Sequence, residues 1–431
     1  MRKISLSPTL FILIFIILTG SLSGLYGLPE AVEPYYDYDK VLPEVNLQAI
    51  MGHITYLSSL STRVTGYPGS YEAANYIARK FREYGLNSLS GESYFQEYTV
   101  TVPIDRGASI KVLPNGPLIE AYALWPNSIQ TCLTPPGGIE GTLIYAGEGT
   151  LRELSEAAQH FNKGLEECIV LMEFNSMDQW VNAAMFGAKA VIFIEPPITN
   201  RLEAQSKFLK TPIKVPRLYV TKEDGLFLKG LAGSPVSVRL ELNMRYENVV
   251  AWNVIGVVRG STFPDDVIIF SSHYDSWSIA PKLAPGADEA SGVAVLLELA
   301  RFFAGHKPRR TLWFIAFSGH WQALAGSREF VEKYYFSEDV LTGKTKLWAL
   351  MNFHLSTESP TLTYVNYGLG YGYSITRSIV SLLAIIEKSR KPLEDLGFAW
   401  ANYVETPRWD MGLHMDSYFI HEAETVAVAR A

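Results

Sequence analysis

Cysteine is nearly absent from this sequence, and so are long charged runs. The 431 residues include two cysteines, Cys132 and Cys168, which excludes a cysteine-based zinc motif and leaves open either a disulfide or two unpaired thiols. The net charge is −7 and no long basic run occurs, so we expect no nucleic-acid partner. Hydrophobic residues reach 48%, a share that suits two or three folded domains and excludes a wholly disordered chain.

The N-terminus holds an apolar run of signal-peptide length. Arg2 and Lys3 precede an unbroken apolar segment from Leu10 to Leu18, and small residues follow it. This order is typical of a secretory signal peptide, and residues 8–28 are also long enough for one membrane anchor. We therefore expect an extracytoplasmic protein, secreted or anchored by its N-terminus. Residues 1–30 then stand outside the fold.

Hydrophobic periodicity divides the rest of the chain into three parts. A linker at 31–45 leads to residues 46–114, where the patterns predict two helices and a strand. Residues 115–249 show short strands around one clear helix, at 177–187, and indicate an inserted β-rich module. The last part, 250–431, follows a different pattern.

From residue 250 onward, apolar strands alternate with amphipathic helices. Uninterrupted apolar strands between such helices indicate a sheet that is covered on both faces. The predicted fold class is therefore α/β, with a mixed, mostly parallel sheet sandwiched by helices. The predicted strands are 254–258, 267–271, 311–317 and 347–353, and the predicted helices are 289–304 and 322–334.

Polar residues follow three of these predicted strands. His273 and Asp275 end one strand, His320 follows the next, His354 follows the last, and Asp288 lies in the turn before a helix. If the strands are neighbours, these groups meet at one sheet edge, where α/β proteins place their sites. Histidine and aspartate are good zinc ligands, and residues two apart on a strand share a face, so Asp275 can orient the His273 ring. A histidine at a strand end is also commonly a hydrogen-bonded loop residue, so spacing alone leaves both readings open.

The segments around these residues resemble the zinc exopeptidase family of aminopeptidase Y, aminopeptidase S and glutamate carboxypeptidase, which has transferrin receptor as a non-catalytic relative. The matching segments, in order along residues 46–430, are 63–66, 73–77, 253–260, 264–269, His-Tyr-Asp-Ser-Trp at 273–277, Gly-Ala-Asp-Glu-Ala-Ser-Gly at 286–292, 308–314 and 319–327. Residues 141–145, 183–193 and 215–220 resemble a protease-associated domain, which the insert 115–249 would form.

The resemblance implies a zinc site. In the family, two zinc ions share a bridging aspartate and a water, and a glutamate acts as general base. Carried over by position, His273 is a zinc ligand, Asp275 positions its ring, Asp288 is the bridge, and His354 stands at a ligand position.

The family's two adjacent glutamates fall on His320 and Trp321. An indole has only an N–H donor and cannot bind zinc, whereas His320 could accept a proton as an unorthodox base. The resemblance therefore implies at most one zinc ion, held by His273, Asp288 and His354, with the second position empty.

The family's last histidine ligand has no clear counterpart. It follows a segment that resembles 416–419, and the nearby His414 and His421 are more simply solvated or capping residues. The chain ends at Ala431, so we expect the 250–431 domain to be incomplete at its C-terminus.

Two functions of different classes follow, with a third, minor alternative. The first is an exported zinc metallopeptidase that hydrolyses a peptide or an N-acyl amino acid at one metal ion. The second is a catalytically inactive peptidase fold that acts as a binding or scaffold domain at the cell surface. The third is a truncated fragment. The sequence favours no oligomeric state.

Overall fold

The computed structural model describes residues 41–355, 361–365 and 399–403. It divides into two compact units, Met1–Asn46, which includes the short turn η1 (Leu42–Glu44), and Leu47–Ala431. The predictions for residues 1–30, His414 and His421 lie outside the described residues. Among the helices that are described, none has the length and apolar character needed to cross a bilayer.

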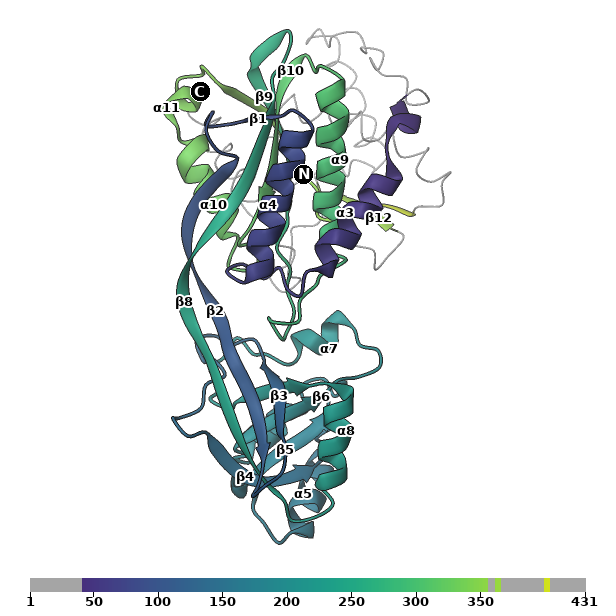
Figure 1. Cartoon of the computed structure of the whole chain (residues 1–431), viewed down its shortest axis with the longest axis vertical. Helices are drawn as coiled ribbons and strands as arrows, with labels where there is room; N and C mark the ends of the chain where they lie inside the picture. The colour runs from purple at the N-terminus through teal and green to yellow at the C-terminus, as the bar shows by residue number, and fades with distance from the viewer. Residues whose placement is uncertain (1–40, 356–360, 366–398, 404–431) are drawn as a thin grey trace, which may run out of the picture. The chain divides into compact units, whose positions relative to one another are not determined.

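A mixed sheet forms the centre of the second unit (Figure 1). Its strand order is β11-β9-β10-β8-β2, and β1 pairs with β8. Strands β9, β10 and β11 run parallel, whereas β8 is antiparallel to both β10 and β2. The strands are β1 (Asn87–Ser88), β2 (Phe95–Val112), β8 (Ser237–Val258), β9 (Phe263–His273), β10 (Arg310–Phe317) and β11 (Lys346–Asn352), with a separate parallel pair β12 (Thr361–Val365) and β13 (Ala399–Tyr403).

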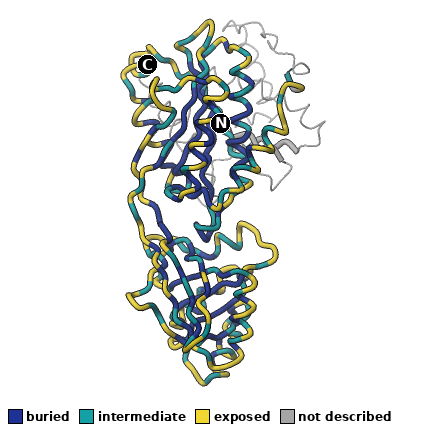
Figure 2. Tube along the Cα trace, viewed as in Figure 1, coloured by how far each residue is buried: buried dark blue, intermediate teal, exposed yellow. Residues whose placement is uncertain are grey.

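Helices cover both faces of this sheet. One face packs against α3 (Leu47–Ser59), α4 (Pro68–Glu83) and α9 (Ala290–Gly305), and the other against α10 (Ala325–Phe330) and the π-turn η3 (Val331–Tyr335). The short helix α11 (Glu338–Leu341) follows. Successive residues of β10 alternate between the two cores, and Figure 2 shows the sheet buried between them. The structure confirms the predicted α/β fold with helices on both faces.

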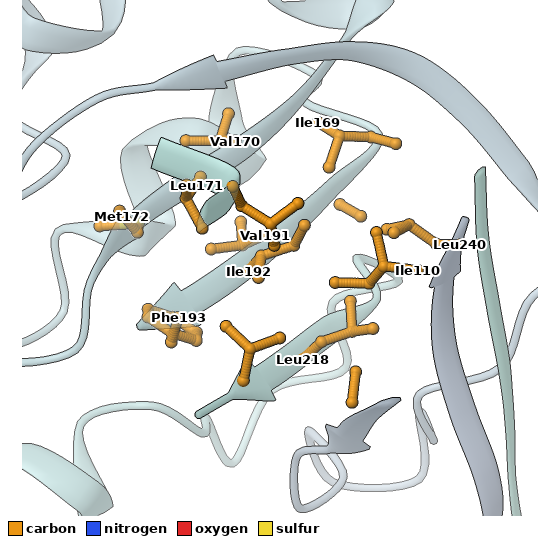
Figure 3. Close-up of a cluster of buried hydrophobic side chains, with 14 of the residues drawn as sticks. Ile110, Ile169, Val170, Leu171, Met172, Val191, Ile192, Phe193, Leu218 and Leu240 are labelled. Atoms are coloured by element: carbon orange, nitrogen blue, oxygen red, sulfur yellow. The ribbon is translucent and has the colours of Figure 1, made fainter. Parts of the chain in front are cut away.

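Strands β2 and β8 continue beyond the sheet into a second, barrel-like body. Their far halves pair at Ala108–Val112 against Val238–Leu242. The pairings β2–β3–β7–β6–β5–β4–β8 lead back to β8, which pairs with β2, so the strands close on themselves. The added strands are β3 (Leu118–Ala123), β4 (Ile139–Tyr145), β5 (Cys168–Glu173), β6 (Ala190–Ile194) and β7 (Arg217–Val220). Their aliphatic side chains fill the interior (Figure 3).

This body holds more helix than its sequence pattern predicts. The predicted helix at 177–187 is the shorter α6 (Trp180–Met185), and three helices that were not predicted join it. They are α5 (Leu151–His160), α7 (Arg201–Gln205) and α8 (Lys222–Leu231), with the short turn η2 (Leu165–Glu167). Cys132 and Cys168 are buried and form no disulfide, so the alternative of two unpaired thiols holds.

Candidate metal centre

The strand order brings three histidines to one edge of the sheet. Strand β9 lies between β10 and β11 and ends at His273. His320 comes three residues after β10, and His354 comes two residues after β11. Because the three strands are parallel, their carboxyl ends meet at the same edge, which is the usual place for a site in an α/β sheet.

The three imidazoles form a compact cluster. One nitrogen of each of His273, His320 and His354 lies within 4.8 Å of the others. The His273 and His320 rings stack at 4.1 Å between centroids, and the His354 ring lies 5.1 and 5.2 Å from them. Nitrogen ligands on a tetrahedral zinc ion with bonds of about 2.0–2.1 Å stand about 3.3 Å apart, so the three nitrogens, which lie within 4.8 Å of one another, would move closer together to share one ion.

Asp275 supports two of the three histidines. Its backbone oxygen lies 3.0 Å from His273 Nδ1, and its Oδ1 lies 3.4 Å from the same nitrogen. Its Oδ2 accepts hydrogen bonds from the backbone N–H of His320 at 3.0 Å and from the Thr65 hydroxyl at 2.9 Å. The buried carboxylate therefore connects the end of β9 to the turn after β10, in the way that carboxylates orient metal-bound histidines.

Arg63 fixes the loop that follows β9. The fully buried guanidinium donates to the backbone oxygens of Tyr274 at 2.9 Å and Gly286 at 2.8 Å, and also to that of Pro285. Burial lowers the pKa of Arg63 to about 10, so it stays charged at neutral pH. One side chain thus ties the 63–66 segment to the strand end and to the turn before α9.

The turn after β10 has an unusual backbone. Gly319 has φ 68°, and the non-glycine residues Ala323 and Leu324 have φ 53° and 57°. A Cβ at Gly319 would lie 2.7 Å from the Tyr98 hydroxyl, so only glycine fits there. The predicted helix at 322–334 therefore begins later, at Ala325, and the turn presents His320 to the cluster.

An aromatic wall stands beside the histidines. The Trp321 ring lies 4.9 Å from the His320 ring and 5.7 Å from Trp277, both between centroids. Trp277 in turn contacts Trp125 at 6.3 Å and Phe208 at 6.0 Å. This row of rings, which we call the aromatic wall, joins residues of the sheet edge to residues of the second body.

Comparison with known proteins identifies part of the chain. Residues 253–398 match the model of peptidase family M28, and this segment holds all three clustered histidines. The chain contains a peptidase family M28 domain.

Curated relatives match the M28 domain over short stretches. A probable zinc metalloprotease of Pyrenophora teres is 45% identical over 86 residues, which cover 19% of this chain and 18% of that protein. Aminopeptidase NAALADL1 of Mus musculus is 34% identical over 109 residues, with 24% and 14% covered. The chain thus matches about a fifth or less of these relatives' lengths.

Two solved structures share the fold along most of the chain. The zinc aminopeptidase of Bacillus subtilis superposes with a TM-score of 0.51 at 21% identity, covering 90% of this chain and 94% of that one. The peptidase M28 precursor of Shewanella amazonensis gives a TM-score of 0.52 at 17% identity, covering 89% and 84%. At these identities the likeness establishes the fold alone.

The cluster in the M28 domain differs from the ligand set that the sequence implied. His273 and His354 come together, but the third member is His320, which was expected as a base. Asp288 is half-buried in the turn before α9 and, within the described residues, is not a member of the cluster. The turn that carries Asp288 is held by Arg63, whereas the turn after β10 folds back and stacks His320 on His273. A role for Asp288 as a ligand stays a prediction.

Sequence reasoning assigned no role to Arg63 or Thr65. The signal was present, because both lie in the 63–66 segment that resembles the family. Their targets, however, are backbone and carboxylate oxygens more than 200 residues away in the chain.

Proposed function

We propose that His273, His320 and His354 bind one zinc ion and that the M28 domain is a zinc metallopeptidase that acts on chain termini. The observation that carries this proposal is the cluster itself, three imidazoles at the carboxyl ends of three adjacent strands. The names of the relatives, zinc metalloprotease and aminopeptidase, supply the metal and the reaction class.

The donor set fits zinc. Three protein ligands that leave one position open are the usual composition of a catalytic zinc site, and three histidines are one known form of it. The backbone oxygen of Asp275, 3.0 Å from His273 Nδ1, is the kind of partner that orients such a ligand. Cluster burial also fits, since His273 and His320 are only 3% and 5% exposed.

The roles of the remaining residues follow from their side chains. A zinc ion held by these histidines would supply a Lewis acid, which lowers the pKa of a bound water molecule and polarises a peptide carbonyl. His320 cannot act as both ligand and base, and its place in the cluster favours the ligand role. Trp321 cannot bind a second ion, so we propose a single-zinc site.

A second candidate is a binding protein without catalytic activity. Trp321 favours it, because an indole stands within 5 Å of the His320 ring at a position where the resemblance implies a carboxylate ligand. In either case we propose an extracytoplasmic location, supported by the N-terminal apolar segment, and an insert of the protease-associated type, supported by segments 141–145, 183–193 and 215–220.

Metal analysis combined with hydrolysis assays tests the proposal. Purified protein should carry zinc and release the terminal residue of aminoacyl or N-acyl dipeptide substrates, and His273→Ala should lose both properties. The matched control is His160→Ala, which removes an exposed histidine at the end of α5. Zinc bound without turnover would favour the binding protein, and neither zinc nor turnover would overturn the proposal.

A further inference from the structure

Two consecutive backbone N–H groups of the turn after β10 donate to one pair of buried side chains. The N–H of Gly319 donates to the Thr65 hydroxyl at 2.9 Å, and the N–H of His320 donates to Asp275 Oδ2 at 3.0 Å. Thr65 in turn donates to the same Oδ2 at 2.9 Å. These four groups, which we call the Thr65 network, connect three segments of the chain through one hydroxyl.

The chemistry of the groups fixes the direction of each hydrogen bond in the Thr65 network. A backbone N–H can only donate and an ionised carboxylate can only accept, whereas a hydroxyl does both. The Thr65 hydroxyl therefore accepts from Gly319 and gives its one proton to Asp275. Thr65 and Asp275 are each only 1% exposed, so little water competes for these bonds. The branched Cβ of threonine also restricts χ1 and with it the position of the hydroxyl.

The segment that carries Thr65 is itself held against the loop after β9. The backbone N–H of Arg63 donates to the Ser276 hydroxyl at 3.0 Å and to the backbone oxygen of Ala284 at 3.2 Å. An isolated parallel bridge pairs Thr62 with Ala284. The hydroxyl of Thr65 thus acts from a fixed support, which is what the positioning of a metal ligand requires.

The turn that carries His320 needs such a hold. Ala323 and Leu324, which follow in the same turn, are left-handed with φ 53° and 57°. Non-glycine residues in this region cost energy and persist only where the surrounding structure fixes them. The turn also keeps the His320 ring stacked on His273, at 4.1 Å between centroids. The Thr65 network fixes the start of this turn and so opposes its relaxation away from the cluster.

We propose that Thr65 is a positioning residue of the metal centre, which holds the turn after β10 so that His320 stays on the cluster. It acts through Asp275 and through the backbone of the turn. As a statement about metal binding this rests on the proposed function. Ligands that are already held near one another lose less freedom when they bind an ion, so the hydroxyl should raise the affinity for zinc.

Thr65→Val tests this role, because valine keeps the shape of the side chain and removes the hydroxyl. In the purified full-length chain, zinc affinity measured by competition with a chelating dye should fall about 10–100-fold, the usual effect of losing a partner that orients a ligand. Thr65→Ser restores the hydroxyl and should recover most of the affinity. The visible absorption of bound Co²⁺, which reports the geometry of its ligands, should change in Thr65→Val and match the wild type in Thr65→Ser.

Thr311→Val is the matched control. Thr311 lies near the start of β10, is 4% exposed, donates to the backbone oxygen of Pro264 at 2.7 Å and accepts from the N–H of Gly260 at 3.0 Å. The variant loses the same two kinds of hydrogen bond at the other end of the strand. It should lose a similar amount of stability and bind zinc as the wild type does. If Thr65→Val does not fold, Thr65→Ala removes the same hydroxyl and takes its place.

Hydrogen exchange in the metal-free protein measures the hold on the turn without zinc or turnover. The amides of Gly319 and His320 should exchange about 5–10-fold faster in Thr65→Val than in the wild type, the value of about one hydrogen bond. They should keep their wild-type rates in Thr311→Val and nearly keep them in Thr65→Ser.

The outcomes separate this inference from the proposed function. Wild-type exchange rates in Thr65→Val, or a loss of zinc affinity no larger than in Thr311→Val, would overturn the role of Thr65 even if zinc and hydrolysis are found. A wild-type chain that binds no zinc would overturn the proposed function, whereas faster exchange at Gly319 and His320 in Thr65→Val would still support the hold on the turn.

Discussion

The histidines of this chain differ in the groups that their ring nitrogens contact. His273, His320 and His354 have other imidazoles as neighbours, an arrangement that suits a shared cation. His53 on α3 instead meets two phenols, with Nδ1 2.6 Å from the Tyr76 hydroxyl and Nε2 3.2 Å from that of Tyr84. The same residue type therefore forms a candidate metal site at one place and packs in the core at another, a distinction that spacing along the chain does not carry.

His53 should make stability depend on pH. Burial, with a smaller effect from Lys80, lowers the pKa of His53 to about 4 from an ordinary 6.5, although Glu298 opposes the shift. Between these values the unfolded state binds more protons, so the free energy of unfolding should fall as pH drops from 6.5 to 4, by about 3 kcal/mol in all. In urea unfolding experiments across this pH range, the free energy of unfolding of His53→Gln should depend less on pH than that of the wild type. The exposed His160→Gln should keep the pH dependence of the wild type.

Asp275 should control metal affinity without touching the metal. Asp275→Asn keeps the shape but removes the negative charge beside His273 Nδ1 and one of the two carboxylate oxygens, of which Oδ2 accepts from the His320 N–H, so zinc affinity should fall about 10–100-fold. Competition with a chelating dye measures this. Asp339→Asn, which alters an exposed carboxylate paired with Lys344, should leave the affinity unchanged, and equal affinities for both variants would contradict the role of Asp275.

Elements of the central sheet could be predicted because their patterns are strong. The apolar strands and the helix before His306 were found near their true bounds, and with them the shared sheet edge. The helices of the second body were harder to predict. Helices α5 and α8 open with side-chain caps at Thr150 and Thr221, each followed three residues later by an acidic residue, but their short apolar faces are weak signals.

The sequence pattern also predicted only parts of the two long strands β2 and β8. Residues 245–250 of β8 are mostly exposed, so the apolar pattern breaks there while the hydrogen-bonded pairing with β2 continues. A register shift between Asp105 and Ala108 marks the passage from sheet to barrel. Pairing over such distances depends on the partner strand and cannot be read from one segment.

Two glycine substitutions should have opposite effects on helices. A Cβ at Gly326 in α10 would overlap the backbone oxygen of Ser318 and Oδ1 of Asn253, so Gly326→Ala should cost about 2 kcal/mol of stability. Gly52 on α3 has nothing within 4 Å, so Gly52→Ala should add about 0.5–1 kcal/mol. Thermal unfolding of the two variants measures both, and a destabilised Gly52→Ala together with an unaffected Gly326→Ala would contradict the packing described.

In the molecule as a whole, the second body contributes side chains that lie near the histidine cluster. Trp125 and Phe208 extend the aromatic wall, and Arg201 lies over Trp321. Sequence reasoning predicted an insert but not this contribution, because the contacts join residues about 70–150 positions apart. It likewise placed His320 at the site and gave it another role, since ring stacking depends on the turn that carries it.

Arg201 should stabilise the contact between the second body and Trp321. Arg201→Ala removes a cation over an indole that is worth about 0.5–1 kcal/mol at an exposed site, so the free energy of unfolding should fall by about that amount. Arg152→Ala, which removes an exposed arginine paired with Glu156 on α5, serves as the control in the same urea titration. Equal free energies of unfolding for the two variants would contradict a stabilising role for this contact.

The zinc content of the wild type and of His320→Ala tests the central claim most directly. Mass spectrometry of purified, dialysed protein should find about one zinc ion per wild-type chain, as a three-histidine site requires, and little or none in His320→Ala. Two ions in the wild type, or one ion retained in His320→Ala, would contradict the three-histidine centre and favour a ligand set that includes Asp288.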